Sequence, residues 1–185
     1  MNRSDIPNLI SFLRIMMVVP IVMLLFREAY GTALLLFLIA GLSDGLDGYL
    51  AKRYGWTSRL GSVLDPIADK ALLVGCYVAL GWMDHIPLWL VLAVVGRDVI
   101  IVAGAAAFYA LIGRYEMMPS WMSKVNTFAQ IVLGLAVVLS LAWYPLPERL
   151  LSAMFQIVLV TTAMSGADYV WTWSRRALSE RRLKS

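Results

Sequence analysis

The chain has 185 residues, of which 61% are hydrophobic and only 15% are charged, and its mean hydropathy is +0.75. A soluble domain has about 25% charged residues, so this composition excludes a typical soluble domain and predicts an all-α integral membrane protein. The net charge of +4 suits attraction to anionic lipid headgroups. It does not indicate a nucleic-acid-binding protein.

Apolar windows of about 20 residues predict six transmembrane helices. The connections between them are short, so six spans use nearly all of the chain, and we expect a single membrane domain over residues 1–185. The predicted spans, in chain order, cover residues 7–27, 31–53, 61–82, 87–112, 121–143 and 148–173.

Lysine and arginine placement predicts the orientation of these spans, because cytoplasmic loops carry an excess of both residues. With six spans the two termini lie on one side of the membrane. Only Arg27 and Arg149 lie on the other side. We therefore expect both termini and the 52–60 loop in the cytoplasm. The compact chain favours a bacterial inner membrane, and a mature or truncated mitochondrial chain is the alternative. The cations on that side are Arg3, Lys52, Arg53, Arg59, Arg114, Lys124, Arg175, Arg176, Arg181, Arg182 and Lys184.

Ionisable side chains inside the predicted spans are costly in hydrocarbon, and they usually mark a functional site. Most lie toward the cytoplasmic ends. Taken along the chain, they are Arg14 in the first span, Asp44 and Asp47 in the second, Asp65, Asp69 and Lys70 in the third, Arg97 and Asp98 in the fourth, and Asp168 in the sixth.

The four aspartates of the second and third spans are arranged in two pairs. Asp44 and Asp47 are three residues apart and Asp65 and Asp69 are four apart, so each pair shares one helix face. The two spans are joined by a short loop, and the pairs are expected to face each other. Four neighbouring carboxylates repel one another unless cations lie between them, and oxygen ligands suit Mg²⁺, Mn²⁺ or Ca²⁺. The pattern predicts a site for two divalent ions.

The spacing of these residues is specific. It resembles the signature of the CDP-alcohol phosphatidyltransferase family, as do the length and the six-span plan. Lys52 departs from the pattern, which usually has arginine there, and Arg53 follows it directly. UbiA-like prenyltransferases also carry aspartate motifs, but with a different spacing in longer chains. The matching residues are Asp44-x-x-Asp47-Gly48-x-x-Ala51-Lys52, then eight residues, then Gly61-x-x-x-Asp65-x-x-x-Asp69.

The resemblance implies transfer of a phosphatidyl group from CDP-diacylglycerol to an alcohol, with release of CMP. By motif position Asp44, Asp47, Asp65 and Asp69 are expected to bind two Mg²⁺ or Mn²⁺ ions, and Asp69 is also expected to be the general base. Family members are commonly homodimers. A non-enzymatic alternative is an ion-binding, transporter-like bundle, although the sequence lacks the repeats or broken helices expected of a transporter. Positions expected around the cytidine nucleotide are Gly48, Ala51, Lys52 and Gly61.

The acceptor alcohol is predicted from weaker signals outside the motif. The segment IPNLISFLRI and the segment LDPIADK resemble members that use phosphatidylglycerol or glycerol-3-phosphate. The Arg97-Asp98 pair and the segment PSWMSKVNTFAQ resemble the CMP-forming cardiolipin synthases, while phosphatidylglycerophosphate synthases carry a second lysine where this chain has Asn126. We therefore expect phosphatidylglycerol as the acceptor, with glycerol-3-phosphate as the alternative. The expected acceptor-binding residues are Asn8, Arg14, Lys70, Arg97, Lys124 and Asn126.

Structural roles compete with acceptor binding at three of these positions. Arg14 could extend its guanidinium toward the membrane interface. Arg97 could pair with Asp98 or Asp168 to hold helices together. Lys124 could be a topology charge.

Overall fold

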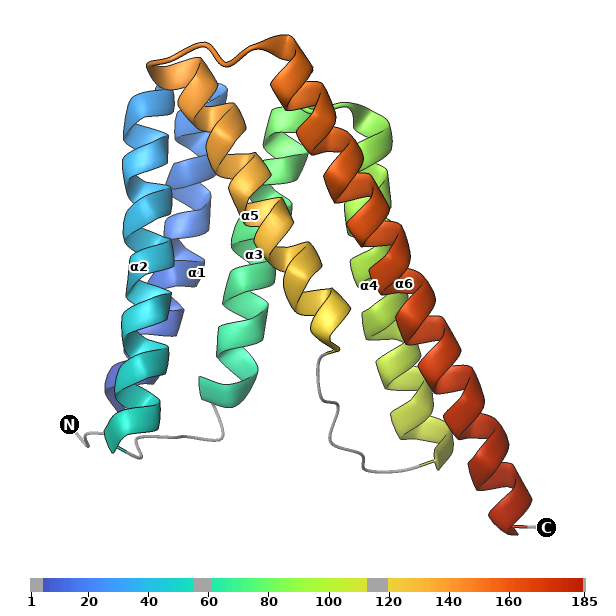
Figure 1. Cartoon of the computed structure of the whole chain (residues 1–185). Helices are drawn as coiled ribbons and strands as arrows, with labels where there is room; N and C mark the ends of the chain where they lie inside the picture. The colour runs from blue at the N-terminus through green and yellow to red at the C-terminus, as the bar shows by residue number, and fades with distance from the viewer. Residues whose placement is uncertain (1–4, 55–60, 113–119, 185) are drawn as a thin grey trace. The chain divides into compact units, whose positions relative to one another are not determined.

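The computed structural model describes residues 5–54, 61–112 and 120–184, with side chains for residues 12–43, 67–104, 120–172 and 175. Within these ranges the secondary structure consists of six α-helices and contains no strand, which confirms the all-α prediction (Figure 1). The helices are α1 (Asp5–Phe26), α2 (Tyr30–Tyr54), α3 (Gly61–Trp82), α4 (Leu88–Ile112), α5 (Trp121–Ala142) and α6 (Glu148–Lys184).

The predicted spans match five of these helices to within two residues at each end. The sixth differs, because α6 continues eleven residues past position 173, to Lys184. A hydropathy window ends where the apolar run ends. Arginine, leucine, alanine and glutamate dominate the last part of α6, and these residues have high helix propensity, so the helix outlasts the apolar run.

Two helical segments among the described residues are long and apolar enough to cross a membrane, Trp121–Ala142 and Glu148–Thr172. The apolar stretches Phe12–Phe26 and Tyr30–Ser43 are shorter. Large hydrophobic side chains such as Leu42 and Val102 are exposed, as expected of surfaces that face lipid. Six membrane spans remain a prediction.

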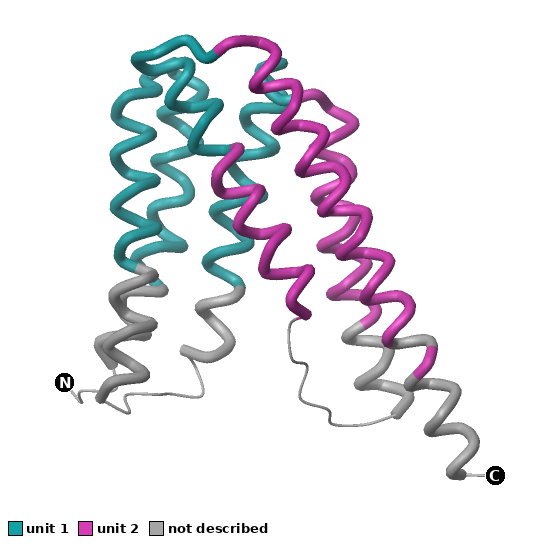
Figure 2. The backbone as a smooth tube through the Cα atoms, in the orientation of Figure 1, with its two compact units in different colours: residues 1–86, 134–146 teal, residues 87–133, 147–185 magenta. Residues whose placement is uncertain are grey.

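The chain divides into two compact units (Figure 2). Unit 1 comprises residues 1–86 and 134–146, and unit 2 comprises residues 87–133 and 147–185. In unit 1, α1 packs against both α2 and α3, the two helices that carry the four motif aspartates. In unit 2, α4 packs against α6.

The α1 and α3 helices of unit 1 run parallel with a constant offset in sequence. Arg14 contacts Asp69 near the middle of the two helices, 55 positions apart in sequence. Further along, Gly75 of α3 faces Val18 and Val22 of α1, whose midpoint is also 55 positions away. The equal offset means that the two helices keep one register. Beyond them, Tyr30, the first residue of α2, contacts His85 in the turn after α3.

The α1 and α3 helices also end in the same way. The amide of Glu28 donates to the carbonyl of Leu25 and the amide of Ala29 donates to that of Leu24, the paired bonds of a Schellman motif. Glu28 has a φ of 58°, the left-handed conformation that this motif requires at the residue after the helix. Asp84, with a φ of 60°, holds the same place after α3.

Candidate functional site

Most of the predicted donor and metal residues lie outside the part of the chain whose side chains the structure describes. Their backbone is helical, which supports the shared face expected for each aspartate pair. Their roles stay predictions. These residues are Asp44, Asp47, Gly48, Ala51 and Lys52 in α2, Gly61 and Asp65 in α3, and Asn8 in α1.

Asp69 is the one motif aspartate with a described side chain. Its Oδ1 accepts a hydrogen bond from Nη1 of Arg14 at 2.7 Å. The Arg14 side chain is 1% exposed, whereas that of Asp69 is 48% exposed. The structure therefore brings together two residues that the sequence analysis assigned to different roles, the base and the acceptor site. Lys70 follows Asp69 and is half-buried.

The half-exposed carboxylate of Asp69 fits the expected metal chemistry. A carboxylate has about four lone-pair positions, and the bond from Arg14 uses one position on Oδ1. Aspartate oxygens are suitable ligands for Mg²⁺ and Mn²⁺. No group of three or more acidic, histidine or cysteine side chains forms among the residues with described positions, a set that excludes the side chains of Asp44, Asp47 and Asp65.

A second ion pair lies in unit 2. Nη1 of Arg97 donates to Oδ1 of Asp98 at 2.6 Å, and both side chains are buried, at 5% and 11% exposed. Nη2 of Arg97 donates to the hydroxyl oxygens of Ser123 at 2.7 Å and Ser165 at 2.5 Å. The Arg97 guanidinium also lies 5.7 Å from the ring centroid of Tyr169. Arg97 of α4 is thereby bonded to both α5 and α6. This arrangement supports the alternative in which Arg97 holds helices together.

Asn126 forms a further polar contact between α5 and α6. It is fully buried, and its Oδ1 accepts hydrogen bonds from the hydroxyls of Thr161 at 3.0 Å and Thr162 at 2.9 Å. The structure thus gives Asn126 a place in helix packing, and its acceptor role stays a prediction. Lys124, two residues earlier, is exposed, and Asp168 is half-buried.

The sequence analysis missed the hydroxyl partners of these two side chains. Ser and Thr occur singly in many membrane helices, where they bond to neighbouring helices or to their own backbone, so each alone is a weak signal. The spacing was informative, because Ser123 and Asn126 are three residues apart and Thr162 and Ser165 are also three apart. Such spacing places polar groups on one face of each helix.

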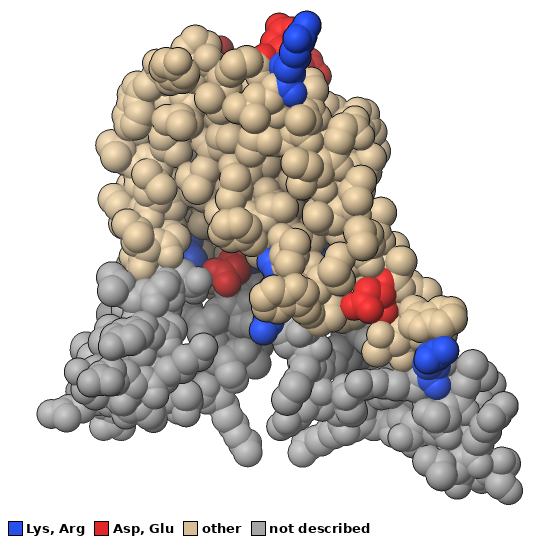
Figure 3. Space-filling view, in the orientation of Figure 1, with Lys and Arg blue, Asp and Glu red and all other residues tan. Residues whose placement is uncertain are grey.

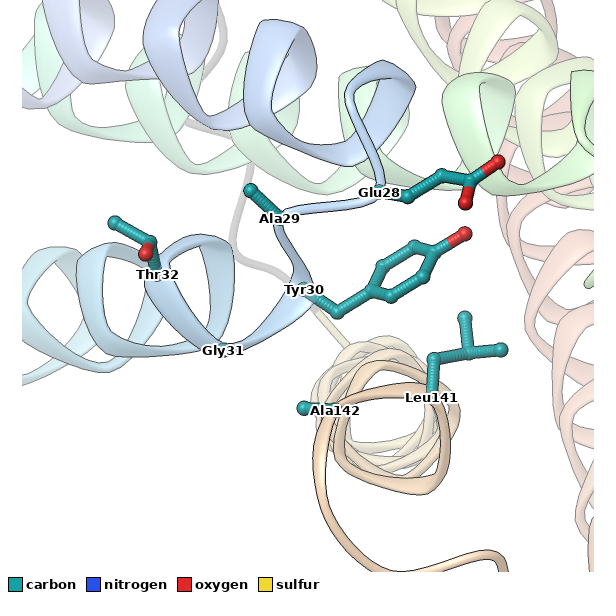
Figure 4. A pocket seen from close by; sticks show the side chains of 7 residues that line it. All are labelled: Glu28, Ala29, Tyr30, Gly31, Thr32, Leu141 and Ala142. Atoms are coloured by element: carbon teal, nitrogen blue, oxygen red, sulfur yellow. The ribbon is translucent and has the colours of Figure 1, made fainter.

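A pocket at the other end of unit 1 is a weaker candidate for the site (Figure 4). It has a volume of about 210 Å³ and is lined at the α1–α2 turn by Glu28, Ala29, Tyr30, Gly31 and Thr32, and on α5 by Leu141 and Ala142. Glu28 supplies its one carboxylate. Along α1, about 20 Å separate this turn from Arg14. The pocket therefore does not include the ion pair.

The described surface is largely uncharged on the face drawn in Figure 3. Exposed apolar side chains occur on every helix, for instance Val19 on α1, Leu92 on α4 and Phe128 on α5. Asp69 is the ninth residue of α3, whereas the exposed acidic side chains of Glu28 and Asp84 lie in turns. The position favours a functional reason for the carboxylate.

Sequence comparisons identify the family of the chain. A family profile described as CDP-alcohol phosphatidyltransferase matches residues 4–174. Over 186 aligned residues, covering 91% of this chain, 33% are identical to the proteins named "Cardiolipin synthase (CMP-forming)" of Rattus norvegicus and of Homo sapiens. The chain spans 61% of the length of each of these two relatives.

Another relative is named for the use of glycerol-3-phosphate. The protein of Blochmanniella floridana named "CDP-diacylglycerol--glycerol-3-phosphate 3-phosphatidyltransferase" is 29% identical over 176 residues. This match covers 92% of the present chain and 91% of the relative.

Proposed function

Because the chain belongs to the CDP-alcohol phosphatidyltransferase family, we propose that it transfers the phosphatidyl group of CDP-diacylglycerol to phosphatidylglycerol, giving cardiolipin and CMP. The observation that supports this reaction best is the ion pair of Asp69 with Arg14. It holds the last aspartate of the family motif half-exposed beside a buried cation. The names of the rat and human relatives favour phosphatidylglycerol as the acceptor.

In the proposed reaction, the acceptor hydroxyl attacks the phosphorus that bears the diacylglycerol. The bond from this phosphorus to the oxygen of CMP breaks, and CMP leaves with that oxygen. The hydroxyl proton passes to Asp69, whose exposed carboxylate satisfies the need for a base that a substrate can reach. Transfer of this kind depends mainly on positioning and charge stabilisation.

The family is generally metal-dependent, and the aspartates at positions 44, 47, 65 and 69 are the residues that would hold Mg²⁺ or Mn²⁺, as two ions in our proposal. When bound, such ions neutralise the negative charge of the attacked and leaving phosphates. Gly48, Ala51, Lys52 and Gly61 would surround the nucleotide, with the small residues leaving room for close approach. These roles follow from motif position in the sequence.

The residues that the sequence assigns to the acceptor are Asn8, Arg14, Lys70, Arg97, Lys124 and Asn126. Lys124 is exposed, and Lys70 is half-buried, so both are accessible to an anionic acceptor. Arg97 and Asn126 are buried, which makes them the weaker members of this set. We further propose a single-domain, homodimeric enzyme with six spans in a bacterial inner membrane, with its termini and active site facing the cytoplasm.

Glycerol-3-phosphate is the second candidate acceptor, giving phosphatidylglycerophosphate and CMP. One observation favours it. The relative of Blochmanniella floridana, whose name gives glycerol-3-phosphate as the acceptor, is 29% identical over 92% of the present chain.

The experiment measures CMP release by the purified full chain in detergent, with labelled CDP-diacylglycerol and each acceptor in turn. We expect CMP release with phosphatidylglycerol and a lipid product that migrates as cardiolipin on thin-layer plates. Release with glycerol-3-phosphate alone would contradict the first choice. No CMP release with either acceptor would contradict the enzyme proposal and favour an ion-binding bundle. Chelation should abolish release, and added Mg²⁺ or Mn²⁺ should restore it.

A further inference from the structure

The buried guanidinium of Arg14 requires a structural explanation. Arg14 lies among apolar residues of α1, and it is 1% exposed although its side chain carries a full charge. An arginine in the middle of a membrane helix is costly unless it is paired or reaches water. Its bond to Oδ1 of Asp69 at 2.7 Å is a charge-assisted hydrogen bond of optimal length.

The packing of α1 against α3 determines which residues of α3 the Arg14 guanidinium can contact. A Cβ added at Gly75 would lie 3.2 Å from Cγ1 of Val18 and 3.4 Å from Cγ2 of Val22, so α1 and α3 approach closely one to two turns beyond the ion pair. Gly75 lies level with the midpoint of Val18 and Val22, and this offset is again 55 residues. The close approach and the ion pair thus share one register, and Asp69 cannot slide along Arg14 without disturbing the packing.

We propose that Arg14 is a positioning residue for the reaction, which fixes the carboxylate of Asp69 in the orientation that receives the acceptor proton. The inference rests on the proposed function, because it assumes that Asp69 is the base. It replaces the direct acceptor contact that the sequence predicts for Arg14, since the buried member of the pair cannot meet a ligand while its exposed partner can.

The inference depends on the difference in exposure between the buried Arg14 and the half-exposed Asp69. An aspartate on a helix surface ordinarily samples more than one rotamer. A bond from a buried, immobile donor selects the rotamer that keeps Oδ1 on Nη1 of Arg14. Misplacement of a reacting group by about 1 Å costs about 100-fold in rate. Removing Arg14 should therefore slow the chemical step without weakening the capture of either substrate.

The first test compares Arg14→Gln and Arg14→Lys with the wild-type chain, using CMP release at varied phosphatidylglycerol. We expect kcat to fall about 100-fold for Arg14→Gln and about tenfold for Arg14→Lys, with the KM values of both substrates within about twofold. Lysine keeps the charge but lacks the planar fork of arginine, which is why its rescue is partial. Arg27→Gln is the matched control, because it removes an exposed cation just beyond α1, and it should leave kcat unchanged.

The second test is chemical rescue. Arg14→Ala leaves a cavity beside Asp69, and millimolar guanidinium should raise its kcat at least tenfold while leaving the Arg14→Ala/Asp69→Asn double variant unchanged. If Arg14→Ala does not fold, the Gln and Lys variants decide the matter alone. A raised KM for phosphatidylglycerol with unchanged kcat would overturn the positioning role and restore direct acceptor binding. A wild-type chain that releases no CMP would instead overturn the proposed function.

Discussion

Two buried arginines, one in each unit, form ion pairs of nearly equal length but of different character. Arg14 reaches Asp69 across 55 residues of sequence, and Arg97 reaches its neighbour Asp98, at 2.7 and 2.6 Å. The acid of the first pair is 48% exposed and that of the second is 11% exposed. The second arginine also binds two serine hydroxyls on other helices.

The difference indicates that an ion pair in an apolar chain can serve either function or packing, and that the exposure of the acid distinguishes the two. A half-exposed carboxylate can meet a solute, a proton or a metal ion. The buried pair of unit 2 lies within α4, and it is the bonds from Arg97 to Ser123 and Ser165 that connect α4 to α5 and α6. We therefore propose a catalytic role for the pair in unit 1 and a packing role for the pair in unit 2.

The largest expected effect is at Asp69. Asp69→Asn keeps the shape of the side chain but removes the base, so CMP release should fall by about 10²- to 10⁴-fold. Binding of labelled CDP-diacylglycerol, measured at equilibrium in detergent, should persist. Asp84→Asn is the matched control, because Asp84 is exposed after α3 at a φ of 60°, a conformation that asparagine also adopts. Equal loss of binding and turnover in Asp69→Asn would make the residue a metal ligand only.

The next effect concerns the stability of unit 2. Arg97→Met leaves Asp98 buried without its cation, which should cost about 3–5 kcal/mol in the free energy of unfolding. The double variant Arg97→Met/Asp98→Leu should recover most of this loss, because an apolar pair of similar volume replaces a buried ion pair at little or no cost. Denaturant titration of the purified chain in detergent would measure both.

The same two variants test whether Arg97 binds the acceptor, as the sequence predicts. A stable double variant with wild-type KM for phosphatidylglycerol would confirm the packing role. A stable double variant with a KM raised tenfold or more would place Arg97 in the acceptor site, and the contrast between the two ion pairs would then fail.

The sequence was sufficient to predict the helices, because apolar runs are separated by short polar or proline-containing connections such as 83–87. The length of α6 was not predictable from hydropathy, since its last eleven residues are polar and helical. Arg14 and Asp69 were each recognised, but their contact was not, because the register between two helices is a tertiary property. Their positions along the helices were informative, because Arg14 is the tenth residue of α1 and Asp69 is the ninth residue of α3.

A smaller effect is expected at the contact between α5 and α6. Thr162→Val removes one of the two hydroxyls bonded to Asn126, which should cost about 1 kcal/mol of stability while leaving kcat within about twofold. Ser152→Ala, at an exposed position of the same helix, should cost nothing measurable. A large rise in the acceptor KM of Thr162→Val would instead support the acceptor role predicted for Asn126.

The smallest effect concerns the contact between the first residue of α2 and the turn after α3. The Tyr30 hydroxyl lies 3.1 Å from Nε2 of His85, and the two rings meet edge to face with centroids 5.8 Å apart. Tyr30→Phe removes the hydrogen bond and keeps the ring contact, so stability should fall by about 0.5–1.5 kcal/mol. Because the packing of Val18 and Val22 on Gly75 lies between this contact and Asp69, CMP release should stay within about twofold of wild type. A tenfold loss of kcat would mean that the register is set from the turns, and that the positioning of Asp69 depends on both ends of the two helices.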